Sequence, residues 1–270
     1  MNDITFAFLL SLLAGLTAGL GGLIIFFSKR QNMRFLSICL SFSAGVMIYV
    51  SFTEIFMKSL EDLEYIWDDG VAFAITTLTF FGGIVFMAII DKFIPHDDKV
   101  FKLIAKKGEN SSSMDSEEAA NLNRMGLSTA AAIAIHNFPE GLVVFLAALH
   151  DPTLGIVIAI AIAIHNIPEG IAVAQPIYYA TGSKTKALLI TTASGLTEPI
   201  GALVGYFLLA QLFNEAVLGI SFALVGGIMV YIAFHQLLPT AQKYADHHTV
   251  LKSMFIGMAV MALSLVLLEL

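Results

Sequence analysis

The stretch Ile133–Gly141 reads IAIHNFPEG, and the stretch Ile162–Gly170 reads IAIHNIPEG. The two copies lie 29 residues apart and differ only at Phe138 and Ile167. Each copy places a His, an Asn, a Pro and a Glu in the middle of a long apolar run. Ionisable groups at membrane depth are costly, so they are candidates for a functional site. A polar network that only holds two helices together would more often use Ser, Thr or small residues.

The composition around these stretches indicates a polytopic membrane protein. Of the 270 residues, 57% are hydrophobic and 13% are charged, whereas a soluble domain carries about 25% charged residues. The mean hydropathy is +0.83. The net charge of −7 comes with no basic face that would suit a nucleic acid. The single cysteine, Cys39, excludes an internal disulfide and a thiolate metal cluster.

Eight segments are apolar and long enough to cross a bilayer, which takes about 20 residues. They are Ile4–Phe27, Phe35–Met57, Val71–Ile94, Gly126–Leu149, Leu154–Tyr179, Ala187–Leu212, Ala216–Leu238 and Leu251–Leu268. Their hydrophobicity does not alternate residue by residue, which argues against a membrane β-barrel. The predicted fold class is therefore an all-α membrane protein that forms one transmembrane domain over residues 1–270.

The basic residues predict the orientation in the membrane. Of the 14 Lys and Arg residues, 13 lie on alternate connections, and only Lys58 lies on the other side, beside several acidic residues. Because basic residues accumulate in cytoplasmic loops, both termini are expected to be extracytoplasmic. The longest connection, at about residues 95–123, is rich in Gly, Asn, Ser and acidic residues at its centre and reads as a flexible cytoplasmic loop.

A fainter repeat aligns Tyr49–Glu54 (YVSFTE) with Tyr231–Gln236 (YIAFHQ). Chance similarity between apolar helices is the alternative explanation. Together with the strong repeat in the fourth and fifth segments, it fits an inverted-topology repeat of three, two and three helices. That architecture is typical of transporters and places the binding site near the bilayer midplane, at the repeat interface.

Helical spacing predicts how the polar side chains of the repeated stretch converge. Residues three and four apart share a helix face, so Glu140 lies one turn from both His136 and Asn137. The second copy repeats this arrangement with His165, Asn166 and Glu169. If the two helices face each other, the two His and two Glu line one cation site, and the two Asn and the same two Glu line an adjacent one.

The sixth segment supplies a third carboxylate, Glu198, which is followed by Pro199. It is the natural partner to complete the site lined by the two Asn residues. Pro139 and Pro168 each remove one helical hydrogen bond and free a carbonyl oxygen one turn earlier. Such an oxygen is tolerated at membrane depth only where protein or water lines a cavity.

The ligand types favour a transition metal. His nitrogens with carboxylate oxygens and no sulfur suit Zn²⁺, Fe²⁺, Mn²⁺, Co²⁺ or Cd²⁺. Sites for Ca²⁺ or Mg²⁺ are built from oxygen and would not need two histidines.

Through these motifs the chain resembles the ZIP (ZRT/IRT-like) family of divalent-metal transporters, specifically its bacterial ZupT-like branch. The matching motifs are HNFPEG at residues 136–141, HNIPEG at residues 165–170 and the Glu198-Pro199 pair. The resemblance implies a binuclear metal centre on the fourth, fifth and sixth segments. It also implies uptake of Zn²⁺ or Fe²⁺ into the cytoplasm across the cell membrane without a cofactor, a homodimer, and an elevator-like motion of the metal-carrying helices.

The chain departs from the family pattern in the seventh segment, where many relatives have His-Glu and this chain has His235-Gln236. A second carboxylate near the inner end is therefore not expected. Glu54, near the outer end of the second segment, has two open interpretations, an entrance ligand or a solvated side chain.

A membrane-embedded di-metal hydrolase or oxidase is the main alternative function. The HExxH motif of membrane metalloproteases is absent from the sequence. Di-metal carboxylate bundles use Glu-x-x-His, whereas here the His precedes the Glu with a Pro between them. A metal-sensing receptor is a third possibility, but the segments outside the membrane are too short for an output domain. The sequence therefore favours a transporter.

Overall fold

The computed structural model describes residues 3–27, 32–93, 116–150, 152–209 and 214–269. All regular secondary structure within these ranges is helical, and eight helical segments are long and apolar enough to span a membrane. The prediction of an all-α membrane protein with eight spanning segments is confirmed.

Three of the eight spans are interrupted. The other five spans are continuous. The first is α1 (Asp3–Gly22), which ends in a short 3₁₀ turn, η1 (Leu23–Phe26). The third is α4 (Asp69–Phe93), the fourth is α6 (Ser116–His150), the fifth is α7 (Pro152–Thr181) and the eighth is α12 (His247–Glu269). The second span comprises α2 (Met33–Val50), the π-helix η2 (Ser51–Ile55) and α3 (Phe56–Glu64). The seventh comprises α10 (Glu215–Ile232), the π-helix η3 (Ala233–Leu237) and α11 (Leu238–Tyr244). The sixth consists of α8 (Lys184–Gly195) and α9 (Thr197–Leu209), with a break at Leu196.

Two predictions need correction. The loop predicted at about residues 95–123 ends earlier, because α6 begins at Ser116 and residues 116–123 form its first two turns; the loop residues up to 115 lie outside the described ranges. The sixth segment, predicted as one helix, is divided at Leu196. A Gly on one side of that residue and Glu198-Pro199 on the other explain the break, since Gly weakens a helix and Pro199 cannot donate the backbone hydrogen bond that would continue it.

Side-chain caps fix four of the helix starts. The side chains of Asn32, Ser183, Asn214 and Asp246 accept hydrogen bonds from the backbone N–H three residues later, at the starts of α2, α8, α10 and α12. These caps satisfy donors that have no partner within the helix.

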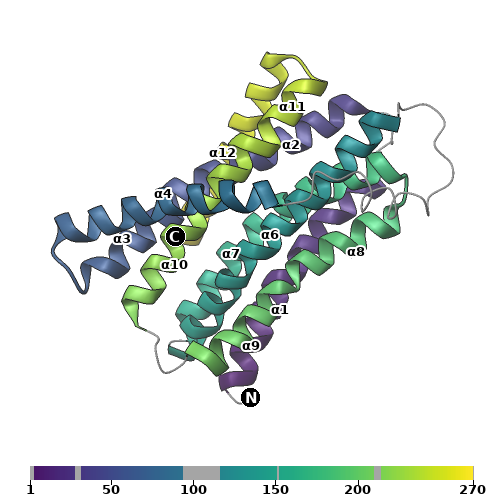
Figure 1. Ribbon diagram of the computed structural model, residues 1–270. Helices are drawn as coiled ribbons and strands as arrows, with labels where there is room; N and C mark the ends of the chain where they lie inside the picture. The colour runs from purple at the N-terminus through teal and green to yellow at the C-terminus, as the bar shows by residue number, and fades with distance from the viewer. Residues whose placement is uncertain (1–2, 28–31, 94–115, 151, 210–213, 270) are drawn as a thin grey trace.

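The helices form two groups that lie side by side (Figure 1). One group contains α1, α6, α7, α8 and α9, and the other contains α2, α3, α4, α10, α11 and α12. Buried apolar side chains of α2, α6, α7 and α10 form the main core between them, for example Leu40, Ile133, Ile177 and Ile228. The core therefore joins the two groups across α2 and α7.

Within the first group, glycines bring α1 into backbone contact with α7, and α6 into backbone contact with α9. A Cβ atom at Gly170 of α7 would overlap with the carbonyl oxygen of Ala18 in α1, and one at Gly21 would overlap with that of Ile167. In α6 and α9, Gly141 lies against the carbonyl oxygen of Glu198, and Gly201 lies against that of Phe138. Gly141 and Gly170 are the last residues of the two repeated stretches, so the repeats set both contacts.

The second group has two contacts of the same kind. Gly45 of α2 lies against the carbonyl oxygen of Met254, and Gly257 of α12 lies against that of Phe42. Gly83 of α4 and Gly227 of α10 make the equivalent reciprocal pair, with the carbonyl oxygens of Leu224 and Phe80. Small residues are the usual means of close helix packing in membranes, because they let backbones approach.

The two π-helices lie at matching positions of the fainter sequence repeat. That alignment pairs Ser51 with Ala233, and these are the first residues of η2 and η3. Glu54 lies within η2 and is partly exposed, and His235 and Gln236 lie within η3. A π-helix inserts one extra residue into a helical turn and is frequent at functional sites. The two segments thus share an irregular backbone as well as a sequence pattern.

Candidate metal centre

The seven residues predicted as metal ligands lie together at the meeting point of α6, α7 and α9. All are at most 3% exposed, and they are His136, Asn137, Glu140, His165, Asn166, Glu169 and Glu198. The two repeated stretches place their polar side chains on the facing sides of α6 and α7. Glu198 lies in the first turn of α9, directly after the break in the sixth span, and is close enough to interact electrostatically with Glu140 and Glu169.

Each histidine faces the glutamate of the other helix. His136 Nε2 lies 3.0 Å from Glu169 Oε1 in a hydrogen bond. His165 Nε2 lies 3.4 Å from Glu140 Oε1, but neither of these two atoms has hydrogen-bond geometry to any partner. Helical spacing predicts that each glutamate lies near the histidine of its own helix, whereas the closest His–Glu pairs in the structure cross between α6 and α7. These four side chains are the set predicted to line the first cation site.

The asparagines lie on the side of α1, α8 and α9. Asn166 Nδ2 donates to the carbonyl oxygen of Ala14 at 3.1 Å and also hydrogen-bonds to Glu198 Oε1. Asn137 Nδ2 donates to the carbonyl oxygen of Ser194 at 3.5 Å. The predicted proximity of Glu198 to the asparagines is therefore present for Asn166. The contacts with α1 and α8 were not anticipated, because backbone carbonyl partners leave no pattern in the sequence.

Many polar atoms of this cluster have no hydrogen-bond partner. They are His136 Nδ1, Asn137 Oδ1, both Glu140 oxygens, both His165 ring nitrogens, Asn166 Oδ1, Glu169 Oε2 and Glu198 Oε2. An unsatisfied buried polar group costs about 1–3 kcal/mol, and three charged carboxylates at mid-membrane would cost about 8–10 kcal/mol together. Apart from a His nitrogen that carries a proton, each of these atoms has a free lone pair. A bound cation would interact with these lone pairs and so offset this cost.

The described part of the chain holds no group of three or more His, Cys, Asp or Glu side chains already arranged to enclose a metal ion. The cluster instead consists of His–Glu and Asn–Glu pairs. Structural metal sites are closed, with all ligands in place.

The backbone around the cluster is held by neighbouring helices. Ser43 Oγ of α2 donates to the carbonyl oxygen of Pro168 at 2.7 Å. Gly15 of α1 and Gly195 of α8 approach so closely that a Cβ atom on either would overlap with the carbonyl oxygen of the other. Both α6 and α7 continue as helices through Pro139 and Pro168. The repeated stretches are thus supported from α1, α2, α8 and α9.

A second polar cluster surrounds Gln236 in η3 and was not predicted. Gln236 Nε2 donates to Asp91 Oδ1 and to Ser128 Oγ, both at 3.1 Å, and Gln236 Oε1 accepts from Thr129 Oγ1 at 2.9 Å. His235 Nε2 lies 3.4 Å from Asp91 Oδ2. The signal that could have identified this cluster is the position of Asp91, an acidic residue within a predicted spanning segment. The cluster joins α4 and η3 to α6.

Comparison with known proteins identifies the family. Residues 97–265 match the family model described as ZIP Zinc transporter. The chain belongs to the ZIP family. It is 49% identical to a zinc transporter ZupT of Clostridium perfringens, over 99% of this chain and 97% of that protein. It is 51% identical to a ZupT of Chlorobaculum parvum, over 98% of each, and 49% identical to one of Streptococcus mutans, over 97% of each.

Membership of the ZIP family decides between the function classes left open by the sequence. ZIP proteins are transporters, so this chain is a multi-pass membrane transporter and not an enzyme. The alternative of a membrane-embedded di-metal hydrolase or oxidase is therefore wrong.

Proposed function

We propose that this ZIP protein carries Zn²⁺ into the cytoplasm through a binuclear site formed by His136, Asn137, Glu140, His165, Asn166, Glu169 and Glu198. The observation that carries the proposal is the concentration of unpaired, fully buried polar atoms where α6, α7 and α9 meet. The relatives named zinc transporter support Zn²⁺ as the cargo.

In this proposal the two glutamates of the repeated stretches belong to both metal sites. His136, His165, Glu140 and Glu169 bind one ion, and the asparagines with the same glutamates and Glu198 bind the other. A mixed nitrogen and oxygen set also accepts Fe²⁺, Mn²⁺, Co²⁺ and Cd²⁺, so iron is a further substrate in the proposal. Ligands must lose protons before they bind metal, which makes transport pH-dependent.

We further propose that the fold is an inverted repeat of three, two and three helices. Two observations support it. In such a repeat the first three spans correspond to the last three, and the fourth span corresponds to the fifth. The reciprocal glycine contact between α1 and α7 then corresponds to the one between α9 and α6, and the contact between α2 and α12 corresponds to the one between α10 and α4. The π-helices η2 and η3 begin at residues that the fainter repeat aligns. Repeats of this kind move against each other around a central site in transporters.

The remaining proposals concern the setting of the protein. Both termini are extracytoplasmic in the cell membrane, since 13 of the 14 basic residues lie on alternate connections. Residues 1–270 form one transport domain, with a cytoplasmic loop before α6. A homodimer follows from the family resemblance, and α4 and α12, of whose spans only 22% is buried, provide the most exposed apolar surface for it.

The test is Zn²⁺ uptake into proteoliposomes that contain the purified protein, compared with Glu169→Gln. This substitution preserves shape but removes a charge shared by both sites, so saturable uptake should fall to the background of empty liposomes. Glu64→Gln, at an exposed glutamate of α3, is the matched control and should transport normally. Normal uptake by Glu169→Gln would contradict the shared-carboxylate site.

A further inference from the structure

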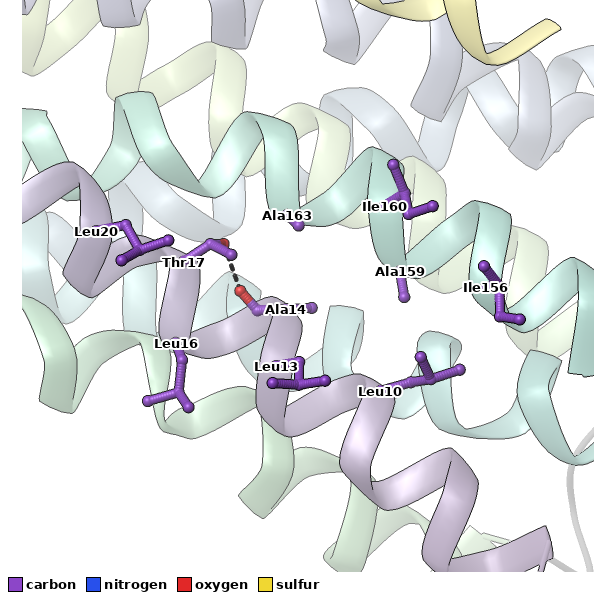
Figure 2. Close-up of a pocket in the computed structure, with 10 residues that line it drawn as sticks. All are labelled: Leu10, Leu13, Ala14, Leu16, Thr17, Leu20, Ile156, Ala159, Ile160 and Ala163. Carbon is purple, nitrogen blue, oxygen red and sulfur yellow. Dashed lines mark hydrogen bonds between the residues drawn. The ribbon is translucent and has the colours of Figure 1, made fainter.

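An apolar groove of about 380 Å³ lies between α1 and α7, and Figure 2 shows side chains of both helices lining it. It lies beyond the close contact at Gly21 and Gly170, toward the N-terminal ends of both helices. Both helices are membrane-spanning segments, and the groove residues lie within the spans Asp3–Phe26 and Gly155–Thr181, from near the start of the α7 span inward. The groove therefore faces the bilayer from one end of the α7 span toward its middle.

The described residues that line the groove are almost all aliphatic. Its base contains the small residues Ala14, Ala159 and Ala163. Thr17 is the one polar side chain among the described lining residues, and its hydroxyl donates to the carbonyl oxygen of Ala14 at 2.5 Å (Figure 2). An occupant must consequently be apolar, because a polar group placed there would lose its hydrogen bonds with water.

The rim of the groove selects against a second helix. Leu13 and Leu20 of α1 are 60% and 58% exposed, and Ile156 and Ile160 of α7 are also exposed. Helices pack closely in membranes where small residues let the backbones meet, and these four bulky side chains would hold a helix away from the alanines at the base. A thin and flexible hydrocarbon chain can pass between them. We propose that the groove is a binding site for one acyl chain of a membrane lipid.

The position of the groove connects this lipid to the metal centre. The carbonyl oxygen of Ala14, at the groove base, accepts hydrogen bonds from both Thr17 and Asn166. Asn166 in turn hydrogen-bonds to Glu198. A chain packed against Ala14 and Thr17 therefore supports the backbone group that orients Asn166. The lipid acts as a packing element behind the asparagine side of the centre.

The test uses fluorescence quenching by a phospholipid with brominated acyl chains. Trp67, the single tryptophan of the chain, is first replaced by Phe. Leu13→Trp then reports on the groove, and Leu78→Trp, at a residue 73% exposed on α4, reports on the general lipid-facing surface. Detergent-solubilised protein is titrated with the brominated phosphatidylcholine. Half-quenching of the Leu13→Trp variant should need at least about tenfold less lipid, which corresponds to about 1.4 kcal/mol.

A second substitution tests occupancy of the groove itself. Ala163→Phe fills the base of the groove, so the Leu13→Trp variant should then need as much lipid for half-quenching as the Leu78→Trp variant. Ala74→Phe, at an exposed alanine of α4, should leave the difference between the two reporters unchanged. Ala163→Leu makes the same comparison if the Phe variant is not monodisperse. Equal quenching of the two reporters would overturn the proposal. Disulfide-linked dimers of a Leu13→Cys variant in membranes would also overturn it, because they would identify a second copy of the protein as the occupant. Quenching is measured without metal, so its outcome is independent of whether Zn²⁺ is the cargo.

Discussion

His136 and Asn137 are neighbours in the chain but serve opposite sides of the metal centre. His136 Nε2 lies next to Glu169 Oε1, whereas Asn137 Nδ2 donates to the carbonyl oxygen of Ser194 and leaves its amide oxygen without a partner. Nitrogen ligands favour Zn²⁺ over harder ions such as Mn²⁺, which prefer oxygen. Under the proposed function, the histidine side should therefore set the metal preference.

His136→Ala should weaken Zn²⁺ transport more than Mn²⁺ transport, because it removes a nitrogen ligand and no oxygen. We expect the ratio of the two transport efficiencies to fall on the order of tenfold, about 1.4 kcal/mol. Competition uptake assays with both metals measure the ratio. Asn137→Ala is the matched comparison and should impair both metals with less change in their ratio. An unchanged ratio in His136→Ala would contradict the assignment of this nitrogen as a ligand.

The repeated stretches allowed six of the seven clustered residues to be predicted, and the Glu198-Pro199 pair inside another apolar segment indicated the seventh. Helical spacing and apolar context are local properties of a sequence. The crossing of the His–Glu pairs and the hydrogen bond from Asn166 to Ala14 depend on how helices distant in the chain are rotated against each other. No pattern along the chain encodes that rotation. For the same reason Asp91 was not recognised as a partner of Gln236.

Among the elements, the long spanning helices were predictable from hydrophobicity, but the π-helices η2 and η3 were not, because nothing in their local sequence marks the extra residue. The break at Leu196 has a local signal, since Gly195 precedes it and Pro199 follows it. Tertiary contacts are made at two of these interruptions. In η3 the side chain of Gln236 hydrogen-bonds to side chains of α4 and α6, and near Leu196 the carbonyl oxygen of Ser194 accepts a hydrogen bond from Asn137 Nδ2.

Gln236→Leu should destabilise the connection between the two helix groups. It leaves Asp91, Ser128 and Thr129 without their shared amide partner, and each buried unsatisfied group costs about 1–3 kcal/mol. Thermal unfolding in detergent should show a clear decrease in Tm. Gln242→Leu, at an exposed position of α11, is the control and should unfold at the same temperature as the unsubstituted protein. Equal Tm values for both variants would contradict a stabilising role for this network.

Gly170→Ala should separate α1 from α7, because the added Cβ atom would overlap with the carbonyl oxygen of Ala18. Overpacking of this kind costs about 1–3 kcal/mol, and the shift also displaces Glu169, the preceding residue. Loss of thermal stability together with reduced Zn²⁺ binding is the expected result, measured by unfolding and by calorimetry. Gly82→Ala, where a Cβ atom meets nothing within 4 Å, should lower neither quantity, since Ala favours a helix interior more than Gly does. A fully stable Gly170→Ala would mean that these helices can move apart at no cost.

For the whole molecule, the distribution of charge predicts which surface meets the cytoplasm. In a Cys39→Ser background, Tyr65→Cys should react with a membrane-impermeant maleimide on intact cells, since residue 65 is exposed between α3 and α4. His248→Cys, exposed at the start of α12, should react only after the membrane is permeabilised. The opposite labelling pattern would reverse the proposed orientation and turn uptake into export.

The contact of α1 with α7 has a consequence for how the protein is made. Gly21 meets Ile167, and Gly170 meets Ala18, so the partner of the first helix is synthesised about 150 residues after it. At about 5–20 residues per second, α1 waits roughly 7–30 s in the bilayer before that partner leaves the ribosome. During this interval the face of α1 that carries Ala18 and Gly21 is covered only by lipid or by the insertion machinery. Substitutions on that face should therefore reduce the yield of correctly assembled protein as well as the stability of the finished one.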